Sequence, residues 1–192
     1  MSTSKIKFAM EGFQFELPSK CLRTTDWNGN QITPYIYLSA KHVASIVKQF
    51  VKMKYPSVVV AATSQVYSGG DSVDVYVSDE RGNGVEESIY KDIDRFADLF
   101  QEGNFNGMID MYEHKETTVS TDNNTTINGG AKYVFVNNRP KFGTVPDVVR
   151  MIRDYQAGKY VGGVRDLAGS IKEVMRYGGI AQATVDKALK LI

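Results

Sequence analysis

The chain has 192 residues, enough for one ordinary domain and a small appendage. Hydrophobic residues make up 42% and charged residues 23%, which is typical of globular proteins and argues against a disordered or fibrous chain. Residues 1–55 carry 8 basic and 3 acidic side chains, residues 56–138 carry 5 and 14, and residues 139–192 carry 10 and 5. Any contact with nucleic acid is therefore expected at the two basic ends.

Several classes of protein are disfavoured by the same inspection. No apolar run approaches the roughly 20 residues that span a bilayer, and the start MSTSKIKFAMEGF lacks the apolar stretch of a signal peptide. We therefore expect a cytoplasmic protein without a membrane partner. The single cysteine, Cys21, excludes an internal disulfide and zinc sites built from paired cysteines, and we expect it to be an unreactive buried side chain.

Residues 5–17 alternate between apolar and polar side chains on either side of Gly12. This pattern predicts two short strands joined by a turn or bulge at that glycine. The polar segment 19–34 is expected to be a connector, in which Trp27 sits beside a turn at Asn28-Gly29 and packs against the core.

Apolar residues then recur at helical spacing, as Val43, Ile46, Val47, Phe50 and Val51. Ser39 is placed to cap this helix and Pro56 to end it. The other flanks of the helix carry lysines, which we expect only to keep that surface in water; they are Lys41, Lys48, Lys52 and Lys54.

The stretch 65–73, QVYSGGDSV, joins two valine-rich runs through a glycine pair. A phosphate-binding loop needs a following helix whose free N–H groups point at the anion, whereas valines at strand spacing follow here. A two-residue turn at Gly69-Gly70 predicts a hairpin in which Val66 pairs with Val73 and the valines share an inner face. The candidate protein-binding residues are Tyr67, Asp74 and Tyr76 on the opposite, polar and aromatic face, and Asp71 beside the turn.

A second helix is expected after residue 83, with Asn83 and Glu86 as a capping box and Gly103 as its stop. Its inner stripe consists of Ile89, Ile93, Phe96 and Phe100. Strands are expected within residues 104–116 and 131–138, separated by an exposed polar loop at 117–130 that offers a second contact surface.

The end of the chain is predicted to be helical, with one helix at 145–158 and two more broken at Gly178-Gly179. The segment 171–189, IKEVMRYGGIAQATVDKAL, resembles the helix-turn-helix of lactose-repressor-type regulators. Its apolar residues would pack two short helices at a steep angle. By this resemblance, the DNA-binding residues would be Gln182 and Thr184 at the start of the second helix, with Arg176, Lys187 and Lys190 near phosphates.

Side chains suited to catalysis are few. His42 follows the cap of the first helix, and Asp110, Tyr112 and His114 share one face of a predicted strand. No phosphate loop, dinucleotide fingerprint or zinc-binding helix motif occurs, so we expect neither a cofactor nor a metal. An enzyme that uses Asp110 and His114 would need a pocket around them.

Residues 38–111 resemble the small α+β domains grouped as large polyvalent protein-associated domains. The resemblance rests on Tyr55-Pro56, the glycine pair followed by Ser72 and Val73, and Gly107-Met108. Asn106 stands where the family pattern has aspartate, and Tyr76 where it has tryptophan. The resemblance implies a protein of bacteriophages or conjugative elements, acting in an infected or recipient bacterial cell.

These patterns together predict an α+β fold, with an antiparallel sheet that carries the glycine-turn hairpin, two helices packed on it, and a C-terminal helical extension. We expect an α+β domain at 1–140 and the extension at 141–192. The first function hypothesis is a non-catalytic accessory protein that binds a host protein or protein–nucleic-acid complex, such as a CRISPR or restriction component. The alternative is a regulator that binds double-stranded DNA through residues 171–192. The sequence does not indicate the oligomeric state. A protein that mimics DNA would need to be acidic throughout, and here only residues 56–138 are acidic.

Overall fold

The computed structural model describes residues 4–106, 111–114, 118–122, 124–159, 166–178 and 180–192. The chain divides into two compact units. The first comprises residues 1–56, 62–75 and 91–136, and the second comprises residues 57–61, 76–90 and 137–192. The fold is α+β, as predicted, with sheets and two helices in the first unit and a helical C-terminal part in the second.

The first unit begins with the predicted hairpin, formed by β1 (Lys5–Met10) and β2 (Phe13–Pro18). Phe8 lies opposite Phe15, so the large apolar side chains of the two strands share one face. Glu11 and Gly12 form the turn, with φ values of 51° and 78°. Two consecutive positive φ angles match the turn type that fits the twist of paired strands. The sequence prediction is confirmed here.

The predicted connector at 19–34 and the predicted loop at 117–130 are both wrong, because each contains a hairpin. A short 3₁₀ turn, η1 (Ser19–Cys21), leads into β3 (Leu22–Thr25) and β4 (Gln31–Leu38), while β9 (Thr118–Ser120) precedes β10 (Thr126–Gly129). The sheet order is β3-β4-β10-β9, and β4 pairs in parallel with β10. Ile36 and Ile127 lie side by side in that pair, and both are buried.

Trp27 does not pack against the core. It is 93% exposed at the tip of the β3–β4 hairpin, so that expectation is also wrong. The reason lies in the loop, where the Asp26 carboxylate accepts hydrogen bonds from the backbone N–H groups of Asn28 and Asn30. These bonds close a tight turn on itself and leave the indole outside it.

The helix α1 (Ala40–Lys54) confirms the periodicity, since its five predicted stripe residues are buried and Ser39 is its N-cap. The helix α2 (Glu87–Asp98) buries Ile93 and Phe96, also as predicted, but it starts later than expected. Asn83 is not its cap, because the Asn83 side chain donates to the carboxylate of Asp79 at 2.7 Å. The helix also ends before Gly103.

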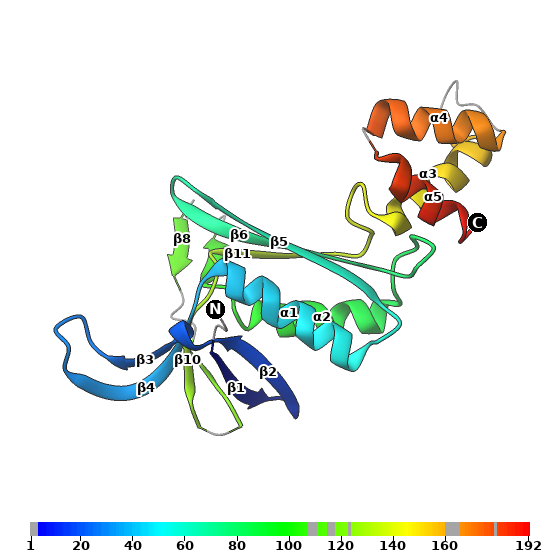
Figure 1. Ribbon diagram of the computed structural model, residues 1–192. Helices are drawn as coiled ribbons and strands as arrows, with labels where there is room; N and C mark the ends of the chain where they lie inside the picture. The colour runs from blue at the N-terminus through cyan, green and yellow to red at the C-terminus, as the bar shows by residue number, and fades with distance from the viewer. Residues whose placement is uncertain (1–3, 107–110, 115–117, 123, 160–165, 179) are drawn as a thin grey trace. The chain divides into compact units, whose positions relative to one another are not determined.

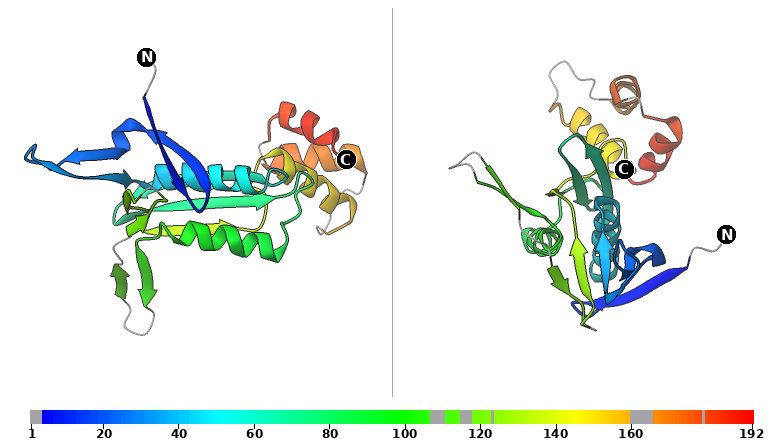
Figure 2. Two further views of the ribbon diagram at one scale, coloured as in Figure 1. Left: turned by 90° about the horizontal axis from the view of Figure 1, so that it is seen from below. Right: turned by 90° about the vertical axis from the view of Figure 1, so that its left-hand side faces the viewer.

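A three-stranded sheet carries the glycine hairpin, in the order β11-β6-β5. Its strands are β5 (Val59–Tyr67), β6 (Gly70–Ser78) and β11 (Tyr133–Asn137). The turn is Ser68-Gly69, one residue earlier than predicted. Val73, Val75 and Val77 are fully buried, but Val66 is 85% exposed, so its predicted place on the inner face is wrong. Figures 1 and 2 show α1 and α2 side by side on one face of this sheet.

The core of the first unit is rich in phenylalanine. The rings of Phe50 on α1 and Phe96 on α2 stack almost in parallel with their centroids 3.8 Å apart. Phe15 of β2 stacks on Phe96 at 5.9 Å, and Phe100 meets Phe96 edge-on. Such aromatic pairs add to the free energy gained by burying the rings. The first hairpin and both helices are therefore packed around one aromatic cluster.

The remaining hairpin of the first unit pairs β7 (Gly103–Asn106) with β8 (Met111–His114) in antiparallel fashion. It corresponds to the strand expected within 104–116. Asp110, which we considered for acid–base chemistry, lies outside the described residues, as do Gly107 and Met108 of the family pattern.

The second unit contains the three C-terminal helices, α3 (Val145–Gln156), α4 (Leu167–Gly178) and α5 (Gln182–Leu189). They share a core that is separate in sequence from the aromatic cluster. Its buried members are Val148, Val149, Ile152, Val174, Ile180, Val185 and Ala188. The predicted helices and the break between the last two are confirmed.

Candidate functional site

The glycine turn holds three segments together. An added Cβ on Gly70 would lie 2.6 Å from Cδ of Lys132, so the glycine makes room for the lysine stem. The Lys132 ammonium group donates to the carbonyl of Gly69 at 2.9 Å, and the Lys132 backbone N–H donates to the Asp71 carboxylate at 2.8 Å. Asp71, a predicted binding residue, is thus half-buried and links the hairpin to the start of β11.

Beside this turn lies a group of side chains that we name the aromatic face, made of the exposed Tyr67 and Phe135 and the half-buried Asp71, Asp74 and Tyr133. Tyr67 is 45% exposed and Phe135 is 51% exposed. The rings of Tyr133 and Phe135 stack with their centroids 6.1 Å apart. Partial burial, followed by the neighbouring Tyr133, Asp71 and Asp74, raises the pKa of the Tyr67 phenol. Tyr133, Asp71 and Asp74 each lie close enough to influence the Tyr67 phenol.

Three of the four predicted protein-binding residues thus lie in the aromatic face, while Tyr76 belongs to the second unit. Tyr76 is half-buried there and lines a small cleft of about 180 Å³ with residues that include Phe142 and Arg150. The sequence interpretation missed Tyr133 and Phe135. Their spacing by two within the strand YVFVN was the available signal, because residues i and i+2 of a strand share a face.

The predicted DNA-binding residues lie on α4 and α5, except Lys190, which directly follows α5. Gln182, Lys187 and Lys190 are exposed, and Thr184 is half-buried. The Gln182 side-chain amide, which was expected to reach base edges, donates to the Asp186 carboxylate at 2.7 Å. Ala181 is the N-cap of α5 and makes no side-chain capping bond. Arg176 lies on α4.

His42 makes two local contacts that stabilise the start of α1. Its Nδ1 accepts the Ser39 backbone N–H at 3.2 Å, and its Nε2 lies 3.4 Å from Sγ of Cys21. Burial, and then the nearby Lys20 and Lys41, lowers the pKa of His42. Burial also raises the pKa of the Cys21 thiol, although Lys20 and Arg23 oppose the rise. Both shifts favour neutral groups, which is unlike the thiolate that a nucleophilic cysteine needs.

The described residues contain no cluster of three or more histidine, cysteine, aspartate or glutamate side chains that could hold a metal ion. Within the same residues, no helix is both long and apolar enough to cross a membrane.

Tyr55 and Pro56, which carry part of the family resemblance, end α1 next to a network of charged groups. The Tyr55 hydroxyl donates to the Asp92 carboxylate at 2.8 Å, and burial together with this bond raises the pKa of Tyr55 to about 12. Lys54 and Arg95 also contact Asp92, and Arg95 makes two bonds to Glu11 at the first turn. The aromatic residue of the motif thus joins α1 to α2.

Comparison with protein families gives one result that covers these elements. The family model described as large polyvalent protein associated domain 29 matches residues 38–142, more than half of the chain. The comparisons with curated proteins and with solved structures found no match. The matched segment contains α1, the glycine hairpin, α2 and β11, and it ends before the three C-terminal helices. The chain belongs to the large polyvalent protein-associated domain 29 family and is a protein associated with phages or other mobile genetic elements.

Proposed function

We propose that this chain is a non-catalytic accessory protein of a bacteriophage or other mobile element, and that it binds a protein of the host cell through the aromatic face. The target class we favour is a defence complex of the CRISPR or restriction type. The proposal is carried by one observation, namely that Tyr67 and Phe135 on the sheet stay about half exposed, with the carboxylates of Asp71 and Asp74 near Tyr67.

The composition of this face resembles that of protein-binding surfaces. Tyrosine and phenylalanine are enriched where proteins bind one another, because they bury a large area with few rotatable bonds. The Tyr67 hydroxyl donates to the Asp71 carbonyl at 3.4 Å and Phe135 stacks on Tyr133, so less conformational entropy of these rings would be lost on binding. Asp71 and Asp74 add negative charge, which favours a partner with a basic rim.

The test compares the wild-type protein with a Tyr67→Ala/Phe135→Ser variant. Affinity capture from bacterial cells, with quantitative mass spectrometry, identifies proteins retained by the wild type and lost from the variant. Titration of the purified partner should then show a loss of at least 30-fold in affinity, because central aromatic residues contribute about 2 kcal/mol or more each. Met53→Ser removes another exposed apolar side chain and should bind like the wild type.

An equal affinity of the face variant and the wild type for that partner would reject the aromatic face. Inhibition of a purified CRISPR or restriction nuclease by the wild-type protein, lost in the same variant, would support the target class.

A DNA-binding regulator is the second candidate function, favoured by the separate core of α3, α4 and α5. Four apolar residues of the segment 171–189 contribute to that core, namely Val174, Ile180, Val185 and Leu189. Lys187 and Lys190 are exposed on or next to α5 and could meet phosphates.

Duplex binding over a salt series tests this second candidate. A Lys187→Gln/Lys190→Gln variant should lower the log–log salt slope by about 2, because each phosphate contact contributes about 0.9. The same slope in both proteins, or no binding to the duplex, would reject it.

A further inference from the structure

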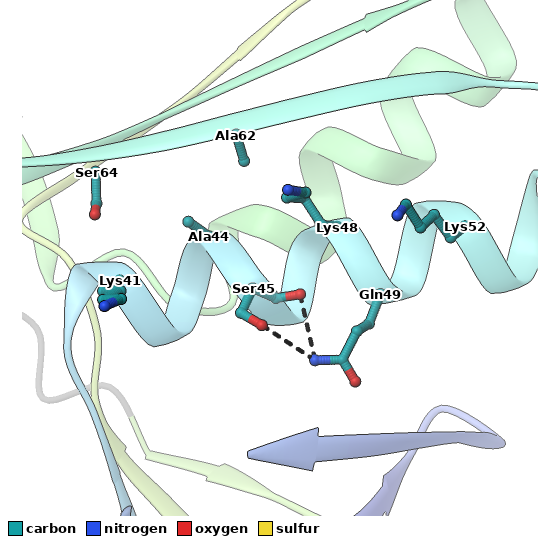
Figure 3. A pocket seen from close by; sticks show the side chains of 8 residues that line it. All are labelled: Lys41, Ala44, Ser45, Lys48, Gln49, Lys52, Ala62 and Ser64. Atoms are coloured by element: carbon teal, nitrogen blue, oxygen red, sulfur yellow. Dashed lines mark hydrogen bonds between the residues drawn. The ribbon is translucent and has the colours of Figure 1, made fainter. Parts of the chain in front are cut away.

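A groove runs between α1 and β5 in the first unit. It has a volume of about 460 Å³. Figure 3 shows its lining, which consists of Lys41, Ala44, Ser45, Lys48, Gln49, Lys52, Ala62 and Ser64. The side chains of Lys48 and Lys52 rise from the helix toward the strand that carries Ala62 and Ser64 (Figure 3).

The three lysines form one row along the helix. They are separated by seven and four residues, which corresponds to about 10 Å and 6 Å along the helix axis. Within the described part of the chain, none of these three lysines makes an ion pair. By contrast, Lys54 lies 2.8 Å from Asp92, and Lys5 lies 2.8 Å from Glu16. The row therefore has positive charge that the neighbouring side chains do not neutralise.

The rest of the lining shows what kind of anion would fit. Ala44, Ala62, Ser45 and Ser64 are small, so the groove has space but no apolar pocket for a peptide side chain. The lining contains no arginine, the residue suited to the planar, two-bond recognition of carboxylates, whereas lysine serves as a point charge for phosphate. Two serine hydroxyls can donate to phosphate oxygens.

Gln49, in the wall of the groove, is held in a fixed position. Its side-chain amide nitrogen donates to the Glu16 carbonyl at 3.0 Å, and its side-chain oxygen accepts the Glu16 backbone N–H at 2.9 Å. A further contact at 3.3 Å reaches the Ser45 hydroxyl. Gln49 thus links α1 to β2, so the groove is already formed without a ligand.

We propose that this groove binds the phosphodiester backbone of a single-stranded nucleic acid, with Lys41, Lys48 and Lys52 contacting successive phosphates. Proteins that bind single strands without sequence preference follow the backbone with a positively charged groove. The site is independent of both candidate functions, because it shares no residue with the aromatic face or with α5.

The test measures binding of the full chain to fluorescein-labelled oligo(dT) of about 16 nucleotides, the upper end of the site size of one small domain. Three phosphate contacts on a single strand predict a log–log salt slope of about −2, or roughly 20-fold weaker binding at 200 mM than at 50 mM salt. The variant Lys41→Gln/Lys48→Gln/Lys52→Gln should lose this slope. A control, Lys5→Gln/Lys7→Gln/Lys20→Gln, removes the same charge elsewhere in the unit and should keep it.

Further binding measurements decide the assignment. Equal binding of oligo(U) and oligo(dT) supports recognition of the backbone and not of the sugar. Tighter binding of a duplex of the same length, or competition by poly-glutamate as effective as by unlabelled oligo(dT), overturns the proposal. An equal loss of oligo(dT) affinity in the two triple variants also overturns the proposal, as does a loss of that affinity in Lys187→Gln/Lys190→Gln. Urea unfolding of each variant ensures that lost binding does not reflect lost folding.

Discussion

His42 ties the stability of the first helix to pH through a single ring nitrogen. Its Nδ1 accepts the Ser39 N–H, and the Ser39 hydroxyl lies 3.0 Å from the same atom. Because an acceptor nitrogen carries no hydrogen, the neutral ring must hold its proton on Nε2, toward Cys21. Protonation of Nδ1 would remove the acceptor of the Ser39 N–H, which is one half of the capping box of α1.

The pKa of His42 is lowered in the folded state, so the unfolded chain binds more protons in the window between that pKa and about 6.5. Stability should therefore fall as the pH drops from about 7.5 to 5.5. In His42→Gln, whose amide oxygen can also accept the Ser39 N–H, this part of the fall should disappear. The urea midpoint of each protein is measured at both pH values. If the midpoint falls by the same amount in His42→Gln as in the wild type, the assignment is contradicted.

At the scale of elements, one five-residue loop occurs twice with the same hydrogen bonds, in Asp26–Asn30 and Asp79–Asn83. In each loop, the backbone N–H of the first residue donates to the carbonyl of the fifth. The aspartate carboxylate accepts hydrogen bonds from two backbone N–H groups and from the asparagine side-chain amide. Thr121–Thr125 repeats the backbone bonds, with Asn124 at φ 57° in the fourth position. In this chain, the pattern Asp-x-x-Gly-Asn thus forms the same five-residue loop both times it occurs in these two segments.

The glycines of the two aspartate loops provide a matched pair of substitutions. Gly29 has φ 88° with nothing within 4 Å of an added Cβ, whereas Gly82 has φ 80° and such a Cβ would lie 2.2 Å from the Pro146 carbonyl oxygen. Gly29→Ala should cost about 1 kcal/mol of unfolding free energy, for the backbone conformation alone. Gly82→Ala should cost clearly more, since it also displaces α3. Urea unfolding compares them, and equal costs would disprove the contact.

How much the sequence could predict differs from one element to the next for a physical reason. The stripe from Val43 to Val51 was readable because a helix that buries a whole face needs many apolar residues. Strands β3, β9 and β10 were not, because polar side chains dominate them and Ile127 alone is fully buried among the strand residues of β10. The parallel partner of β10, strand β4, is distant in sequence, and no local pattern records such pairing. Among site residues, Tyr67 was predicted from strand alternation, whereas the lysine groove depends on where β5 lies relative to α1.

At the scale of the whole molecule, each unit has its own core, one aromatic and one aliphatic. Ile152 is fully buried among the C-terminal helices, so Ile152→Ala should cost about 2–5 kcal/mol locally. Hydrogen exchange followed by mass spectrometry should show faster exchange across residues 145–189. Protection of Val43–Val51 should be unchanged, because those residues belong to the first unit. Equal acceleration in both segments would instead indicate one cooperative unit.

The parallel pairing of β4 with β10 has a consequence for where the family domain can be cut. The family match begins at Leu38, the last residue of β4, yet β10 lies inside the match. A fragment of residues 38–142 would leave the backbone N–H and C=O groups of β10 open along one side, and would uncover the face of Phe96 that Phe15 now occupies. Open strand edges and bare aromatic surface favour aggregation. The protein's minimal soluble form therefore has to retain the strands from Lys5 onward.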